Sequence, residues 1–122
     1  MAAKTALRID QGATYRFSFD WSYNSGTTEE PVWEEYNLDG CSARLEIREK
    51  IGGPLLTSVS TEDGGITIEG GSLLVELSAE KTDLLNVKKA VWDCEVTFPG
   101  GDVVRVLQGP VLVSLSVTTG EA

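Results

Sequence analysis

Carboxylates are the residues of this chain whose type and spacing could do chemistry. A cluster of glutamates brackets Pro31-Val32-Trp33 and is followed by Tyr36; its members are Glu29, Glu30, Glu34 and Glu35. A pair of carboxylates can act as general acid and base when a cleft positions both and shifts the pKa of one. Nothing in the sequence supplies such a cleft, so the simplest interpretation of these glutamates is a solvated acidic rim.

Other catalytic and metal-binding patterns are missing. The chain has no histidine, which rules out a Ser-His or Cys-His nucleophile. The acidic turn at Glu62-Asp63 lacks the alternating oxygen ligands of a dedicated calcium loop. Glycine pairs at 52–53, 64–65, 70–71 and 100–101 open no helix, so none is typical of a phosphate cradle. We therefore expect no enzyme, no catalytic residue, no cofactor and no metal site.

The charge of the chain restricts its partners. Acidic residues outnumber basic ones by 19 to 10, which gives a formal net charge of −9 at pH 7. Such a surface repels phosphate backbones and anionic lipid, so we expect neither nucleic acid nor a membrane as partner. No apolar run approaches the roughly 20 residues of a membrane helix, and the first ten residues lack the apolar core of a secretory signal. We expect a chain that is made and kept in a cytoplasm.

The cysteines are too few for a disulfide framework, since Cys41 and Cys94 are the only two. Both fall on the apolar side of an expected strand. Two reduced thiols that pack as small hydrophobes are the favoured interpretation, and a bridge between facing strands is the alternative.

Strands must position any site, because alternation of apolar and polar residues dominates the sequence. The clearest alternating run, residues 41–49, follows an Asn-Leu-Asp-Gly turn at 37–40. A register shift of one residue would bring two arginines and a glutamate into the core, so strand pairing is strongly specified here. Further strands are expected at 6–9, 15–21, 55–60, 66–69, 72–77, 90–98, 103–107 and 111–118.

Three of these segments carry specific expectations. The aromatics of residues 15–21 share one face, which favours an aromatic core over a ligand-stacking platform; they are Tyr15, Phe17, Phe19 and Trp21. The Gln-Gly-Pro segment at 108–110 is expected to break the run before the last strand, whose inward residues would be Val111, Val113, Leu115 and Val117. Residues 79–85 predict a helix of at most two turns, with Ser78 as its N-cap and Asn86 left-handed at its end.

Eight or nine short strands, Gly-rich turns and one helical turn predict an all-β fold. We expect one antiparallel β-sandwich, immunoglobulin-like, or a barrel of about eight strands. A single domain would span residues 1–122, with its core at 6–118, an N-terminal arm at 1–5 and an acidic loop at 22–38. In that loop Trp33 and Tyr36 either cover the core or dock on a partner, and the sequence leaves both alternatives open.

Residues 37–48 read Asn-Leu-Asp-Gly-Cys-Ser-Ala-Arg-Leu-Glu-Ile-Arg. They resemble the signature DLTG-x-x-A-R-hydrophobic-x-hydrophobic-R of small structural proteins from tailed bacteriophages and prophages. The similarity extends over about residues 6–118, through the aromatic strand before this run and the strands after it. Two positions depart from the family pattern: Asp39 stands in place of threonine, and residues 86–89 stand in place of a glycine.

The resemblance implies a non-enzymatic virion component, assembled in the host bacterial cytoplasm and present in many symmetric copies. Its place would be the neck or collar, the tail or baseplate, or the capsid surface as a decoration protein. Its partners would be other virion proteins and copies of itself. An aromatic anchor within a charged rim is typical of interfaces, so the expected contact residues are Glu29, Glu30, Trp33, Glu34, Glu35 and Tyr36. The alternative is a carbohydrate- or host-surface-binding module that stacks Trp21 or Trp33 on sugars.

Overall fold

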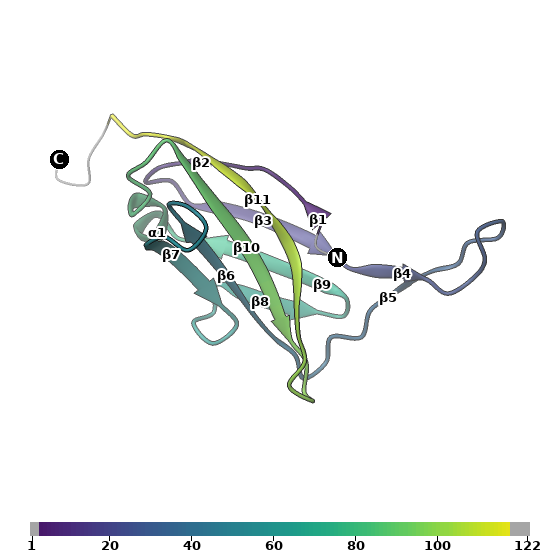
Figure 1. Ribbon diagram of the computed structural model, residues 1–122. Coiled ribbons are helices and arrows are strands. Elements are labelled where there is room, and N and C mark those ends of the chain that lie inside the picture. Colours follow the sequence, from purple (N-terminus) through teal and green to yellow (C-terminus); the bar gives the residue numbers. More distant parts are fainter. Residues whose placement is uncertain (1–2, 118–122) are drawn as a thin grey trace.

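The computed structural model describes residues 3–117. Strands hold 54% of these residues and a helix holds 4%. Figure 1 shows two layers of strands and a thin two-stranded arm that projects from one end. The all-β, sandwich-like prediction is confirmed, whereas the strands do not form one closed barrel.

The larger sheet combines antiparallel and parallel pairs. Its antiparallel strands are, in order, β7 (Leu55–Ser60), β6 (Ser42–Arg48), β10 (Lys89–Thr97) and β11 (Val103–Ser114). Two N-terminal strands, β1 (Ala3–Lys4) and β2 (Leu7–Asp10), pair in parallel with β11. The expected antiparallel arrangement therefore does not hold at this edge, where residues 3–4 belong to the sheet rather than to a free arm.

The smaller sheet closes the core from the other side. Its strands are β3 (Tyr15–Asp20), β9 (Ser72–Leu77) and β8 (Ile66–Glu69), all antiparallel. Phe17 of β3 meets Trp92 of β10 edge to face, with ring centroids 5.7 Å apart. The four aromatics of residues 15–21 are half-buried against this core, which confirms their interpretation as core residues. The core is built from the inward residues of both sheets, as the alternation requires.

β11 runs without a break from Val103 to Ser114, so the break expected at 108–110 is wrong. Cys94 pairs with Leu107 and Glu95 pairs with Arg105, which leaves Val106 as the extra residue of a β-bulge. Because of the bulge, both Val106 and Leu107 are buried. Inward positions therefore have even numbers before the bulge and odd numbers after it.

The proline in this segment interrupts the neighbouring strand instead. Lys4 is in register with Gln108 and Leu7 with Val111, so the gap between β1 and β2 lies opposite Gly109 and Pro110. Proline supplies no N–H to a ladder, which explains why the parallel pairing stops there and then resumes.

The end of β11 differs from expectation as well. Val111 and Val113 are buried, but Leu115 is 43% exposed and Val117 98% exposed. The inward positions expected for Leu115 and Val117 are wrong because the strand ends at Ser114. Thr118, the last residue of the expected strand, lies outside the described residues.

The single helix, α1 (Ala79–Asp83), begins as expected and ends early. The Ser78 hydroxyl accepts a hydrogen bond from the Lys81 N–H, which confirms the N-cap. The left-handed conformation expected for Asn86 is wrong, since positive φ angles within residues 3–117 occur only at glycines. The fully buried Thr82 donates a hydrogen bond to the carbonyl of Ala13 at 2.9 Å, which ties α1 to the turn before β3.

The two thiols are unbonded, in agreement with the favoured interpretation. Cys94 lies opposite Leu45 of β6, and Cys41 is four residues away along that chain segment. This separation is roughly 13 Å at the rise of a strand, which is too far for a disulfide. Burial, with a smaller effect of the neighbouring carboxylates, raises the pKa of Cys94 to about 12, so its thiol stays protonated near neutral pH.

Candidate functional site

The segment expected as an acidic loop is an ordered β-ribbon. β4 (Ser22–Asn24) and β5 (Trp33–Glu35) pair antiparallel and form what we name the β4–β5 arm, residues 22–35. At its tip, the side-chain oxygen of Asn24 accepts hydrogen bonds from the N–H groups of Gly26 and Val32 at 2.9 and 3.0 Å. Figure 1 shows the arm extending beyond both sheets. The Asn-Ser-Gly signal at 24–26 therefore marks the turn of a projecting hairpin.

The base of the arm is fixed to the body by stacked rings. Tyr36 stacks on Trp21 with centroids 4.4 Å apart, and Tyr23 meets Tyr36 edge to face at 4.9 Å. The backbone N–H of Trp21 donates a hydrogen bond to the Gly71 carbonyl at 2.8 Å, and the backbone N–H of Tyr36 donates one to the Trp21 carbonyl at 3.0 Å. A Cβ at Gly71 would lie 2.8 Å from the Tyr36 carbonyl oxygen, so this close approach requires glycine. The arm therefore leaves the body from a defined, packed base.

Trp33 lies on the projecting part of the arm. Its side chain is 68% exposed, the highest exposure of any aromatic within residues 3–117. Of the two alternatives for Trp33 and Tyr36, covering the core holds for Tyr36, which is half-buried against it. It does not hold for Trp33, which stays exposed. Because side chains alternate along a strand, Trp33 and Glu35 share one face of the ribbon and Glu34 lies on the other.

The charge of the arm is entirely acidic. Its carboxylates are Glu29, Glu30, Glu34 and Glu35, and no lysine or arginine occurs between Arg16 and Arg44. All four are exposed, and none takes part in the ion pairs of the described residues. Glu29 and Glu30 precede β5, and Glu34 and Glu35 lie on opposite faces of it, so the carboxylates are spread over the arm rather than gathered in a convergent pair.

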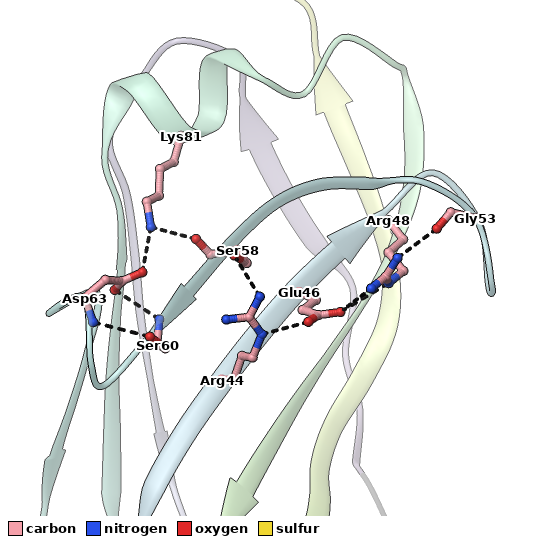
Figure 2. Close-up of polar contacts among 8 residues, drawn as sticks. All are labelled: Arg44, Glu46, Arg48, Gly53, Ser58, Ser60, Asp63 and Lys81. Atoms are coloured by element: carbon pink, nitrogen blue, oxygen red, sulfur yellow. Dashed lines mark hydrogen bonds and ion pairs between the residues drawn. The ribbon is translucent and has the colours of Figure 1, made fainter.

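A second polar cluster, on the outer face of the larger sheet, was not singled out from the sequence. Figure 2 shows Glu46 between Arg44 and Arg48 on β6. Arg44 Nε lies 2.7 Å and Arg48 Nη2 lies 2.8 Å from the Glu46 carboxylate. The hydrogen bond from Arg44 is the largest cause that lowers the pKa of Glu46, and together with Arg48 it outweighs partial burial. Arg48 also donates to the Gly53 carbonyl at 2.9 Å, which holds the β6–β7 turn.

The acidic turn at Glu62-Asp63 has a structural role. Lys81 of α1 donates to the Asp63 carboxylate at 2.8 Å and to the Ser58 carbonyl at 2.7 Å, as Figure 2 shows. Partial burial alone would raise the pKa of Asp63, but the hydrogen bonds from Lys81 and from the Ser60 and Gly65 N–H groups lower it overall. The carboxylate therefore joins the helix to the turn between β7 and β8.

A depression of about 520 Å³ lies on the outer face of the larger sheet, and Glu46 and Arg48 of the polar cluster form part of its lining. We name it the sheet groove, and its lining includes three basic and two acidic side chains as well as exposed apolar ones. The basic side chains are Lys4, Arg48 and Arg105. Arg48 and Arg105 pair with the two acidic ones, Glu46 and Asp93, the latter pair at 3.4 Å. The volume of the sheet groove is within the range of ligand-binding sites, about 300–1,000 Å³.

Residues 3–117 bring together no group of three or more His, Cys, Asp or Glu side chains that could hold a metal ion. The same residues contain no helix with the length and apolar character needed to cross a membrane.

These observations define an all-β, sandwich-like protein that carries a projecting acidic arm and a groove on one sheet. Comparison with protein-family models and with curated proteins gives no match. The resemblance of residues 37–48 to tailed-phage structural proteins stays a prediction.

Glu46→Gln is expected to lower the free energy of unfolding by about 1 kcal/mol or less at pH 7, because the paired side chains are partly solvated. The folded-state pKa of Glu46 is lowered, so its stabilisation is present above its unfolded pKa of about 4.3 and is lost as pH falls through the folded value. Urea unfolding at pH 7 and at pH 2.5 measures the difference between the two chains. This difference in the free energy of unfolding should be smaller at the lower pH.

The matched control is Glu69→Gln, at an exposed position of β8 outside the ion pairs of the described residues. This change should alter stability less at both pH values. A Glu46→Gln effect of equal size at pH 7 and 2.5 would show that the two arginines do not act on the charge of Glu46.

Proposed function

We propose that this chain is a non-enzymatic assembly protein that docks on its partner through the β4–β5 arm. One observation carries the proposal: Trp33 is 68% exposed on an arm whose base is packed against the body. An exposed tryptophan surrounded by charge is the usual composition of an interface anchor. Covering such a side chain removes apolar surface from water and stabilises the complex by about 2 kcal/mol.

The backbone of the arm supports the same role. The arm is a two-stranded sheet, with no third strand paired to it within residues 3–117. An isolated two-stranded ribbon is marginally stable, and its unpaired N–H and C=O groups can accept a strand from a partner. Docking would therefore cover the tryptophan and also stabilise the ribbon by pairing its free backbone groups.

The sequence resemblance supplies the setting, a tailed-bacteriophage particle in which the chain is one of many copies. The residues of that resemblance form the turn before β6 and β6 itself, at the centre of the larger sheet. Gly40 in the turn has a φ of 78°, a conformation that suits glycine. In this proposal the sandwich is the scaffold, and the arm contacts neighbouring virion proteins or copies of the chain.

Trp33→Ala is expected to reduce incorporation into particles at least tenfold, because the anchor of the arm is removed. Particles produced in the presence of tagged wild-type or variant chain are purified, and the tag is quantified by immunoblot. Circular dichroism should show the same fold and thermal midpoint for both chains.

The control is Leu84→Ala, which removes a 55% exposed apolar side chain at the end of α1, away from the arm. This variant should be incorporated like wild type. Normal incorporation of the folded Trp33→Ala chain would refute the arm as docking element.

Sugar binding is the second candidate, and of its two aromatics only Trp33 is available. Trp21 is half-buried and stacked with Tyr36. Saturable quenching of tryptophan fluorescence by a glycan, lost in Trp33→Ala, would favour this candidate over assembly.

A further inference from the structure

We propose that the arm docks on a second copy of this chain, whose sheet groove receives Trp33. The inference rests on the proposed function, because it names the partner of the same arm. Two observations support it: the arm is acidic whereas the groove has an excess of basic side chains, and both surfaces expose apolar side chains.

The charges of the arm and the groove are complementary. The arm carries four carboxylates and no basic residue. The groove lining carries one basic side chain more than acidic ones, on a chain whose net charge is −9. Lys4 takes part in none of the ion pairs among residues 3–117, so its ammonium group can receive a carboxylate. Glu35, which is exposed and shares a face with Trp33, is the carboxylate that we expect to pair with Lys4 of the second copy.

The groove also offers an apolar surface for the indole. Ile51 in its lining is 90% exposed, and Val91 and Pro110 contribute further apolar surface. A volume of about 520 Å³ accommodates one tryptophan side chain with room for its neighbours. An indole covered by these residues and rimmed by ion pairs has the composition of an interface hot spot.

Geometry makes the contact intermolecular. The groove lining contains no residue of the arm, and Figure 1 shows the arm directed away from the strands that form the groove. An arm that enters a different surface of the next copy forms a heterologous contact, which propagates until the copies close a ring or form a filament. Each copy then uses one arm and one groove.

The test uses one variant for each surface. The arm variant is Trp33→Ala, and the groove variant combines Lys4→Glu with Ile51→Glu, both at exposed positions. Sedimentation velocity is recorded from about 10 µM to 0.5 mM, a range that covers weak association. Wild type should form species larger than a dimer as concentration rises, and each variant alone should stay monomeric. Leu84→Ala should behave like wild type.

An equimolar mixture of the two variants is the decisive sample. The arm variant still has an intact groove and the groove variant an intact arm, so one junction can form. The mixture should give a 1:1 dimer and nothing larger, and higher salt should weaken it because its charges are exposed. A dimer also shows that neither variant is misfolded at its remaining surface.

Two results overturn the inference: a wild-type chain that is monomeric at every concentration, or a mixture that stays monomeric although wild type associates. If the wild-type chain is monomeric and Trp33→Ala still fails to enter particles, the arm docks on another protein and only the inference falls. If the folded Trp33→Ala chain enters particles normally, the proposed function falls as well.

Discussion

Trp92→Ala is expected to lower the free energy of unfolding by about 3–5 kcal/mol, the range for removing a large buried aromatic side chain. Trp92 is 3% exposed and lies on β10 in the larger sheet. Its ring contacts Phe17 of the smaller sheet, and its indole N–H donates to the Thr5 carbonyl at 2.9 Å. One side chain therefore connects both sheets and the N-terminal edge.

Urea unfolding followed by circular dichroism measures this effect, with Trp92→Phe as the matched variant. Phenylalanine keeps most of the buried apolar volume but leaves the Thr5 carbonyl without its donor, so its loss should be smaller, about 1–3 kcal/mol. Trp33→Ala should stay within about 0.5 kcal/mol of wild type, since its side chain is exposed. A loss below about 1 kcal/mol for Trp92→Ala would contradict the packing described for the core.

Gly109→Ala is expected to lower the free energy of unfolding by about 2–4 kcal/mol, through overpacking and a lost hydrogen bond. A Cβ at Gly109 would overlap the backbone carbonyl of Thr5. The N-terminal segment must then move away from β11, which separates the Thr5 carbonyl from the Trp92 indole. The parallel pairing of β1 with β11 should weaken at the same time.

The control is Gly100→Ala, in the turn between β10 and β11, where an added Cβ meets no atom within 4 Å. Chemical unfolding should show near-normal stability for this variant. Proteolysis should release the N-terminal segment faster from Gly109→Ala than from Gly100→Ala. Equal stability of the two variants would show that the Thr5 carbonyl does not lie over Gly109.

The strands with strict alternation could be predicted from the sequence. In β6, apolar residues such as Leu45 and Ile47 alternate with charged ones, and a single register buries the first kind and exposes the second. The N-cap of α1 could also be predicted, because the Ser78 side chain and a backbone N–H form it locally. Local patterns of this kind need no knowledge of distant neighbours.

The edge formed by β1, β2 and β11 could not be predicted in this way. Gln108-Gly109-Pro110 has the composition of a turn, yet it lies within a strand because Trp92 and Thr5 pack over Gly109. The bulge at Val106 changes the inward positions of the strand, and no local signal announces it. The packing over Gly109 also depends on a distant segment, since Thr5 and Trp92 are 87 residues apart in the chain.

The candidate site, too, could be predicted only in those parts that depend on local sequence. The composition of residues 29–36 predicts an interface. It does not predict the ribbon, because the ribbon depends on the stacking of Trp21 and Tyr36 at its base, two residues that are 15 positions apart in the chain. The sheet groove has no signature in the sequence, since Lys4, Arg48 and Arg105 come from three strands that only the fold brings together. The pattern of a polar strand face is visible in advance, but a hollow on that face is not.

Hydrogen–deuterium exchange of the free and the assembled chain tests most directly whether the β4–β5 arm is the docking element. Amides of β6 and β10, at the centre of the larger sheet, should be protected in both states. Amides of residues 22–35 should exchange readily in the free chain and at least tenfold more slowly after assembly. Equal exchange of the arm in both states, with protection gained elsewhere, would contradict docking through the arm.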